Sequence, residues 1–166
     1  SIVIAFSIAT LVFIPMLTST TAPIKSYLSY TLPVVGAGWI IALTGLIDDV
    51  KELSAKKKMI GILLAASLVW FLTDFRLNDF KIPFGGPLLH FEPWLSYLLT
   101  VIWIVSITNA VNLIDGLDGL VSGVSIISLV TMGIVSYFFL PVPNLFLTMT
   151  IFVLVASIAG FFPFNY

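Results

Sequence analysis

The chain alternates long apolar stretches with short polar ones, and this alternation is its main structural signal. No charged residue occurs between Ser1 and Ile24, and none occurs between Ser26 and Ile47. A helix needs about 20 predominantly apolar residues to cross the hydrocarbon core of a bilayer. The pattern therefore predicts about six membrane-spanning helices, at residues 2–17, 32–47, 59–73, 93–114, 119–140 and 145–163.

Two of the polar segments between these helices carry further information. Residues 48–58 (DDVKELSAKKK) form the most polar stretch of the chain. Within the mixed loop 74–92, residues 79–91 form two short extended pieces around Gly85-Gly86. Because glycines between strand-like runs favour a hairpin turn, the predicted fold is all-α: a polytopic transmembrane helix bundle with one short external β-hairpin.

Composition supports the membrane class and excludes several kinds of function. Hydrophobic residues make up 60% of the chain and charged residues only 9%, whereas a soluble domain carries roughly 25% charged residues. The absence of cysteine excludes disulfides, thiolate catalysis and zinc–sulfur sites, and a single histidine, His90, cannot form a multi-histidine metal site. A net charge of −1 gives no electrostatic reason to expect a nucleic acid partner.

The basic residues predict which loops face the cytoplasm. Four of the seven, Lys51 and Lys56–Lys58, lie in one short loop, and the positive-inside rule places such a loop in the cytoplasm. The chain returns to the same side at 109–118 and again at 161–166, while loops 74–92 and 141–144 fall outside. We therefore expect both aspartate clusters on the cytoplasmic face.

The two ends of the sequence suggest a longer protein. The chain begins without an initiator methionine or a basic region, and no charged residue follows Asp118. We expect residues 1–166 to form a single membrane domain that is incomplete at both ends.

Asp48 and Asp49 are the first candidates for chemistry. Adjacent carboxylates repel each other unless a cation or a shared proton relieves them, and such a pair suits a divalent cation or a general base. The alternative is a solvated helix end, and the two interpretations carry about equal weight for these residues alone.

A stronger pattern occupies residues 109–120 (NAVNLIDGLDGL). Asn109, Asn112, Asp115 and Asp118 recur every three residues, a spacing that keeps side chains on one helical face. Carboxylates and carboxamides at membrane depth are costly, so they indicate a functional site. The alternative is a polar turn between helices with Asp118 as helix N-cap, but capping does not require the other three residues.

Together these motifs resemble a known family. Residues 45–49 (GLIDD) with the following 53–56 (LSAK), the run 109–120, and residues 160–165 (GFFPFN) are similar to three cytoplasmic motifs of the polyprenyl-phosphate N-acetylhexosamine-1-phosphate transferases. Order and spacing agree from Gly45 onward, and the second motif is the most specific.

The resemblance implies a multi-pass enzyme of the bacterial cytoplasmic membrane whose active site faces the cytoplasm. Such an enzyme transfers a sugar-1-phosphate from a UDP-sugar to undecaprenyl phosphate, releases UMP and uses Mg²⁺, or Mn²⁺ in its place. Ile114 resembles the UDP-GlcNAc branch, which serves teichoic-acid and O-antigen (lipopolysaccharide) synthesis; the phospho-MurNAc-pentapeptide branch, which usually carries threonine there, is the alternative. Whether the protein is a homodimer stays open.

The resemblance also implies roles for individual residues. Asp48 and Asp49 would be catalytic, near the lipid phosphate and as metal ligands, and the nucleotide-sugar would meet Asn109, Asn112, Asp115, Asp118 and Asn165. The family's main metal-binding aspartate and its histidines are expected beyond residue 166, so we expect these 166 residues alone to be inactive. Ile62 stands where the family carries a glutamine.

Two other classes of protein compete with this interpretation. An intramembrane prenyltransferase also uses aspartates and Mg²⁺, but its aspartate motifs have wider spacing than Asp115 and Asp118. A transporter would place carboxylates near the middle of the bilayer and would show internal repeats. Here the aspartates lie at span ends, and the sequence shows no repeat.

Overall fold

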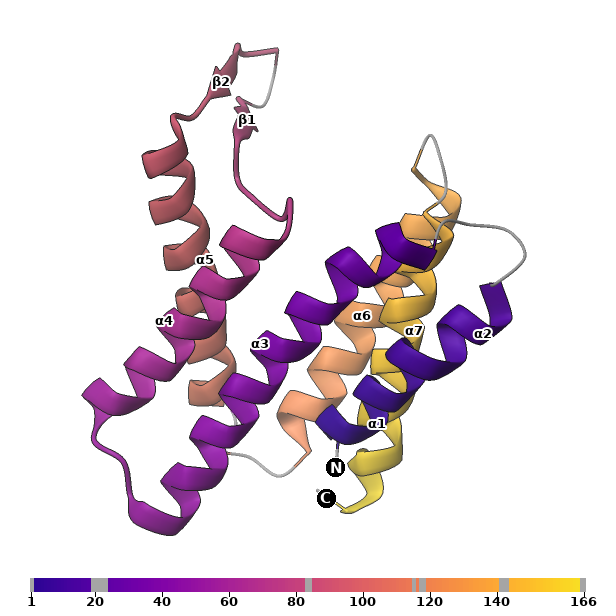
Figure 1. Cartoon of the computed structure of the whole chain (residues 1–166). Helices are drawn as coiled ribbons and strands as arrows, with labels where there is room; N and C mark the ends of the chain where they lie inside the picture. Colours follow the sequence, from indigo (N-terminus) through magenta and orange to yellow (C-terminus); the bar gives the residue numbers. More distant parts are fainter. Residues whose placement is uncertain are drawn as a thin grey trace. The chain divides into compact units, whose positions relative to one another are not determined.

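The computed structural model describes residues 2–18, 24–82, 85–114, 116, 119–140 and 144–164. Figure 1 shows the elements, which in chain order are α1 (Ile2–Ile8), the π-helix η1 (Ala9–Phe13), α2 (Ile14–Thr18), α3 (Ile24–Lys51), α4 (Ala55–Leu72), β1 (Asp79–Lys81), β2 (Leu88–His90), α5 (Pro93–Ile114), α6 (Leu120–Phe138), α7 (Leu145–Phe161) and the 3₁₀ turn η2 (Phe162–Phe164).

The predicted fold class is confirmed: the protein is all-α with one small antiparallel hairpin, and each predicted span contains helix. Helix α5 has the predicted bounds. Helix α3 is longer than the predicted 32–47, and α4 begins at Ala55 instead of residue 59. At the end of α3 and at the start of α4 the helix includes charged residues that flank the apolar stretch, such as Asp48 and Lys58, whereas at its start α3 extends back to Ile24.

Within the described part of the chain, four helical segments are long and apolar enough to cross a membrane: Tyr27–Lys51, Pro93–Ile114, Leu120–Phe138 and Leu145–Phe164. Helix α4 has 18 residues, but its first turn carries Lys56–Lys58, which shortens its apolar part. The apolar stretch Ile2–Met16 is shorter than these four.

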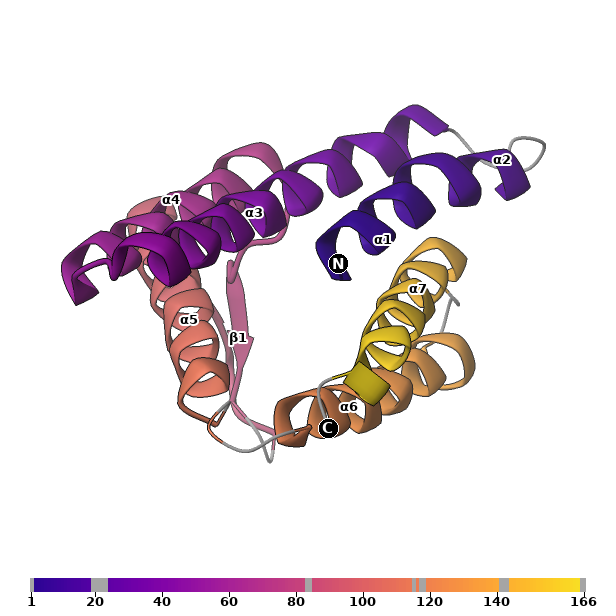
Figure 2. The ribbon, with the colours of Figure 1, turned by 90° about the horizontal axis from the view of Figure 1, so that it is seen from below.

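The chain forms two compact units, and each is described by itself. The first consists of Ser1–Thr31 with Val111–Tyr166, and the second of Leu32–Ala110. In the first unit α6 and α7 lie side by side (Figure 2). Gly133 lets the ring of Phe152 approach, and the Thr148 hydroxyl donates a hydrogen bond to that of Ser136 at 3.1 Å.

The N-terminal segment of the first unit contains a π-helical turn beside a buried threonine. Thr10 is fully buried, and its hydroxyl donates to the Phe6 carbonyl. The Thr10 carbonyl accepts the Tyr27 hydroxyl at 3.1 Å, and the Tyr27 ring packs on Phe146 with 5.0 Å between centroids. Tyr27 therefore links the start of α3 to η1 and to α7.

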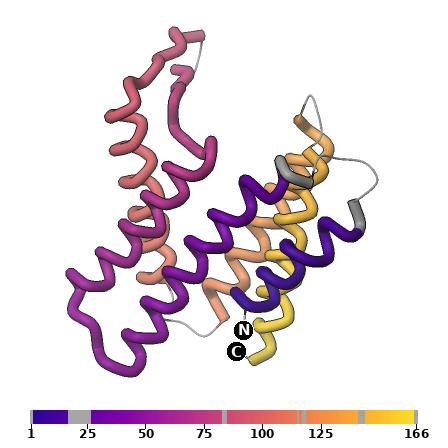
Figure 3. The backbone as a smooth tube through the Cα atoms, in the orientation of Figure 1, coloured from indigo at the N-terminus to yellow at the C-terminus, as the bar shows by residue number. Residues whose placement is uncertain are grey.

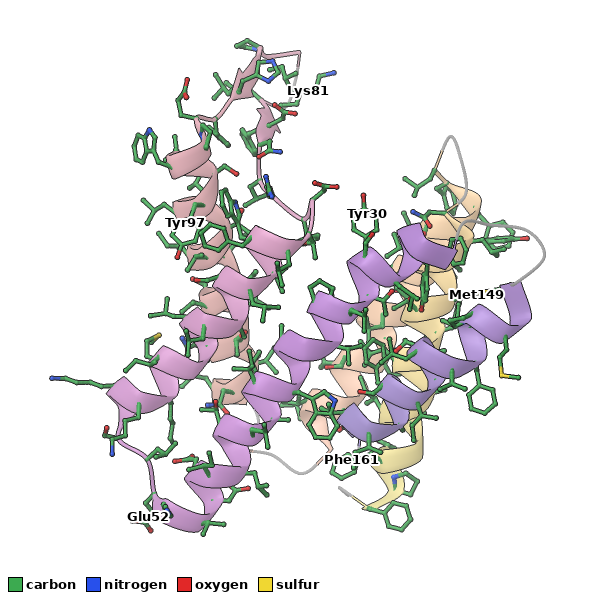
Figure 4. All side chains as sticks on the ribbon, viewed as in Figure 1. Tyr30, Glu52, Lys81, Tyr97, Met149 and Phe161 are labelled. Carbon is green, nitrogen blue, oxygen red and sulfur yellow. The ribbon has the colours of Figure 1, made fainter. Side chains whose placement is uncertain are left out.

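In the second unit the chain runs along α3, turns into α4 and returns along α5 after the hairpin (Figure 3). Small residues line the face of α4 that is buried: Gly61, Ala65 and Ala66. Such residues let membrane helices approach closely. The hydroxyls of Ser67 on α4 and Tyr97 on α5 hydrogen-bond at 3.0 Å, and Figure 4 labels Tyr97.

Polar and apolar side chains are distributed as a lipid environment requires. Among the described residues, the largest fully buried side chains are those of Thr10, Thr100 and Ser96, whereas Ile127 and Phe138 on α6 are about 70% exposed. The hydroxyls of Thr10 and Thr100 donate to carbonyls one turn earlier, and small side chains at contacts with large apolar ones turned outward are typical of membrane helices. Packing therefore supports the membrane class that composition predicts.

Candidate functional site

The first candidate site is the α3–α4 elbow, residues 48–58, which joins two helices of the second unit. Helix α3 ends at Lys51, and Glu52 takes a left-handed conformation with φ of 45°, which ends the helix. The Leu53 amide then donates to Asp48 Oδ1 at 2.8 Å, while α4 begins after Ser54. The Asp48 carboxylate thus binds the backbone of the turn that follows its own helix.

The other oxygen of Asp48 meets a cation from the next helix. Lys58 Nζ lies 2.5 Å from Asp48 Oδ2, and the side chains are 42% and 23% exposed respectively. The Lys58 ammonium thus offsets part of the negative charge of the two adjacent carboxylates. Sequence reasoning missed this role of Lys58, because ten sequence positions separate it from Asp48 and only the turn brings the two together.

A close helix contact lies about one turn from this pair. A Cβ atom at Gly61 would lie 2.4 Å from Thr44 Oγ1, so only glycine fits at this position without a shift. Thr44 precedes Asp48 by four residues and Gly61 follows Lys58 by three, so each lies on the same helix face as its charged neighbour. The contact therefore sets the distance between α3 and α4 beside the ion pair.

Asp49 differs from Asp48 in its surroundings. Its side chain is exposed, as are Lys56 and Lys57 in the first turn of α4. An exposed carboxylate beside one that is paired with a lysine can accept a proton or contribute an oxygen to a hard cation such as Mg²⁺. Within the described residues no group of three or more His, Cys, Asp or Glu side chains could hold a metal ion.

The second candidate site begins on the last turns of α5. Asn109 is half-buried and Asn112 is exposed, and helical geometry places both on one face, as their spacing predicts. Asp115 and Asp118 lie outside the described residues. Gly119, with φ of 72°, takes the N-cap position of α6 without a side-chain cap. The alternative interpretation of Asp118 as the N-cap of α6 falls on a residue outside the described part of the chain and is not tested.

The third motif lies at the end of α7. Helix α7 is followed by the 3₁₀ turn Phe162–Phe164, and Asn165 lies outside the described residues. The structure thus joins Asp48, Asp49 and Lys58 in one elbow and sets Asn109 and Asn112 on one helix face. The roles assigned to these residues by resemblance stay predictions.

Comparison with known proteins agrees with these motifs. The sequence model of the family described as "Glycosyl transferase family 4" matches residues 31–166. A protein of Bacillus subtilis (strain 168), named "Probable undecaprenyl-phosphate N-acetylglucosaminyl 1-phosphate transferase", is 40% identical over 73 residues. The aligned stretch is 43% of this chain and 19% of that relative. No solved structure matches the chain.

Proposed function

The chain belongs to glycosyl transferase family 4, and from this membership we propose that the protein transfers GlcNAc-1-phosphate from UDP-GlcNAc to undecaprenyl phosphate at the cytoplasmic face of the membrane. UMP is the other product, and the lipid-linked sugar serves cell-wall polymer or lipopolysaccharide synthesis. The observation that carries the choice of substrates is the 40% identity to the Bacillus subtilis relative, whose printed name states this reaction class.

The proposed reaction exchanges one phosphate bond for another. An oxygen of the lipid phosphate attacks the β-phosphorus of UDP-GlcNAc, the bond from that phosphorus to the bridging oxygen breaks, and UMP leaves. Phosphoryl transfer depends chiefly on alignment and charge neutralisation. The α3–α4 elbow suits charge neutralisation, because Lys56 and Lys57 present exposed positive charge beside Asp49 at the end of an apolar helix.

We assign the two carboxylates different duties within this proposal. Asp48 binds the Leu53 amide and Lys58, so it holds the elbow in shape. Asp49 is exposed, and in this proposal it takes the proton of the lipid phosphate or binds metal. When bound, Mg²⁺ or Mn²⁺ neutralises the diphosphate of the sugar donor, and an oxygen ligand such as Asp49 fits both ions.

The second motif would bind the sugar donor. Asn109 and Asn112 offer carboxamides on one face at the end of α5, where both donors and acceptors of hydrogen bonds are available to a nucleotide-sugar. Asp115, Asp118 and Asn165 complete this set in the proposal.

Release of UMP tests the proposal directly. The full-length protein in liposomes containing undecaprenyl phosphate receives UDP-GlcNAc, UDP-GalNAc, UDP-glucose or UDP-MurNAc-pentapeptide in turn. We expect UMP release with UDP-GlcNAc that depends on the lipid phosphate and stops with EDTA. Release with UDP-MurNAc-pentapeptide alone would assign the protein to the other branch of the family, and no release with any donor would reject the transferase.

A further inference from the structure

The register of the hairpin (β1 and β2) separates a wholly apolar face from one that carries the charged side chains. Phe80 pairs with Leu89, and Asp79 pairs with His90. Because successive strand residues point to opposite faces, Phe80, Leu89 and Ile82 share one face. The other face carries Asp79, Lys81 and His90 together with Leu88, and Asp79 Oδ1 and His90 Nδ1 are 2.5 Å apart. We call Phe80, Ile82 and Leu89 the apolar hairpin face.

The apolar hairpin face is uncovered in the described part of the chain. Phe80 is 53% exposed, Leu89 43% and Ile82 37%. The two strands stay paired as far as Ile82, because the Ile82 amide donates to the Pro87 carbonyl at 3.2 Å. A paired ribbon therefore displays three large apolar side chains.

Hydrogen bonds fix the base of the hairpin on α5. The Leu77 amide donates to Thr100 Oγ1 at 3.0 Å, and Ser96 Oγ donates to Asn78 Oδ1 at 2.9 Å. Ser96 and Thr100 are buried, and the Phe91 amide closes the base by donating to the Asn78 carbonyl at 2.8 Å. The hairpin is thus held against a helix that is long and apolar enough to span the membrane.

This anchorage sets the level of the hairpin along α5. Thr100 follows Pro93 by seven residues, which is about 10 Å along a helix, so Leu77 lies about that far below the helix start. Phe80 comes three residues later, about 10 Å along an extended chain. Figure 1 shows β1 and β2 at the end of α5 that begins with Pro93. Phe80 therefore lies near the level at which the apolar helix begins.

An exposed tryptophan marks the same level. Trp94, in the first turn of α5, is 68% exposed. Tryptophan and other aromatic side chains collect where membrane spans meet water. The hairpin thus lies at the level of a residue typical of the lipid headgroup region.

We propose that the apolar hairpin face inserts into the headgroup region of the bilayer at the Pro93 end of α5, and that the hairpin acts as a membrane-surface anchor between α4 and α5. Lipid suits this face better than a protein, because a stable protein interface needs about 800 Å² on each partner. Three side chains cannot supply that area. The proposal does not depend on the transferase activity.

Spin labelling can test this with matched positions on the two faces. The 166 residues contain no cysteine, so the full-length protein, with any other cysteine replaced by serine, is labelled with a nitroxide at Phe80→Cys, Leu89→Cys or Lys81→Cys in phosphatidylcholine liposomes. Lys81 is the control, because it neighbours Phe80 on the opposite face, and Figure 4 shows it on the hairpin. Accessibility to oxygen, which enriches in lipid, is compared with accessibility to a water-soluble nickel chelate.

We expect oxygen to dominate at positions 80 and 89 and the nickel chelate to dominate at 81. Equal behaviour on the two faces, or dominance of the nickel chelate at both 80 and 89, would overturn the proposal. Protection of 80 and 89 from both reagents would also overturn it, since that result means coverage by protein. Using two positions on the apolar face keeps the test valid if one variant folds poorly.

Discussion

Lys58 Nζ lies 2.5 Å from Asp48 Oδ2, and this pair joins the first turn of α4 to the last turn of α3. Asp48 also accepts the Leu53 amide, so both of its oxygens have partners. The pair leaves exposed Asp49 as the carboxylate of the elbow that is more open to a ligand.

Replacing either carboxylate by its amide should lower turnover in the full-length enzyme. Loss of a general base costs a factor of roughly 10²–10⁴, and we expect a loss in this range for Asp49→Asn. Asp48→Asn should also lower turnover, because it removes the charge that pairs with Lys58 and holds the elbow. UMP release measures the effect, and thermal unfolding in detergent checks that the variants fold. Near-normal turnover in both variants would favour the solvated helix end.

The Lys58→Gln variant distinguishes the effect of the ion pair on turnover from the effect of the overall positive charge of the elbow. Ion pairs this exposed contribute little to stability, so the melting temperature should stay close to wild type while turnover falls. Lys57→Gln is the control, because Lys57 is its exposed neighbour in the same helical turn. An equal loss in the two variants would show that only the overall positive charge matters.

Gly61→Ala should destabilise the protein, because the new methyl group would meet Thr44 Oγ1 at 2.4 Å. Overpacking of this kind costs about 1–3 kcal/mol. Gly45→Ala is the matched control, since a Cβ there meets nothing within 4 Å. Adding Thr44→Ala to Gly61→Ala should restore part of the lost stability in thermal unfolding. Equal melting temperatures for the two single variants would contradict the close contact.

Asp115→Asn should weaken binding of the UDP-sugar about tenfold or more, since an unmade hydrogen bond to a buried group costs about 1–3 kcal/mol. Asp118→Asn should weaken binding likewise, whereas Asp118→Ala should in addition lose a helix cap worth about 1 kcal/mol. Titration calorimetry with UDP-GlcNAc measures this. Full binding by Asp118→Asn, with only lower stability in Asp118→Ala, would assign Asp118 a structural role.

Cysteine labelling can establish which side of the membrane each loop faces. A membrane-impermeant maleimide added to intact cells should modify Lys81→Cys on the hairpin and spare Ala55→Cys in the elbow, because the positive-inside rule places the lysine loop in the cytoplasm. Both positions are exposed. Lys81 is preferable to Gly86, where an added Cβ would lie 2.5 Å from the Ile82 side chain. The reverse labelling pattern would invert the proposed orientation.

The sequence by itself determined the class of fold and the approximate place of every helix. Hydrocarbon thickness imposes a length on each apolar stretch, so residues 93–114 could be predicted as the helix that the structure contains. The hairpin could be predicted as well, because its two strands and the Gly85-Gly86 turn are neighbours in sequence. The transferase motifs were also recognisable, since each occupies one continuous run of residues.

Only the tertiary structure decided what depends on residues from different elements. The pairing of Lys58 with Asp48 and the contact of Gly61 with Thr44 both require a turn whose geometry rests on the left-handed backbone of Glu52. Glutamate has no special preference for that conformation, so no residue type in the sequence indicates this turn. The hydrogen bonds that Leu77 donates to Thr100 and that Ser96 donates to Asn78 likewise join a loop to the helix that follows it. Hydropathy records how each residue partitions between water and lipid, whereas these contacts depend on which faces meet after the helices have packed.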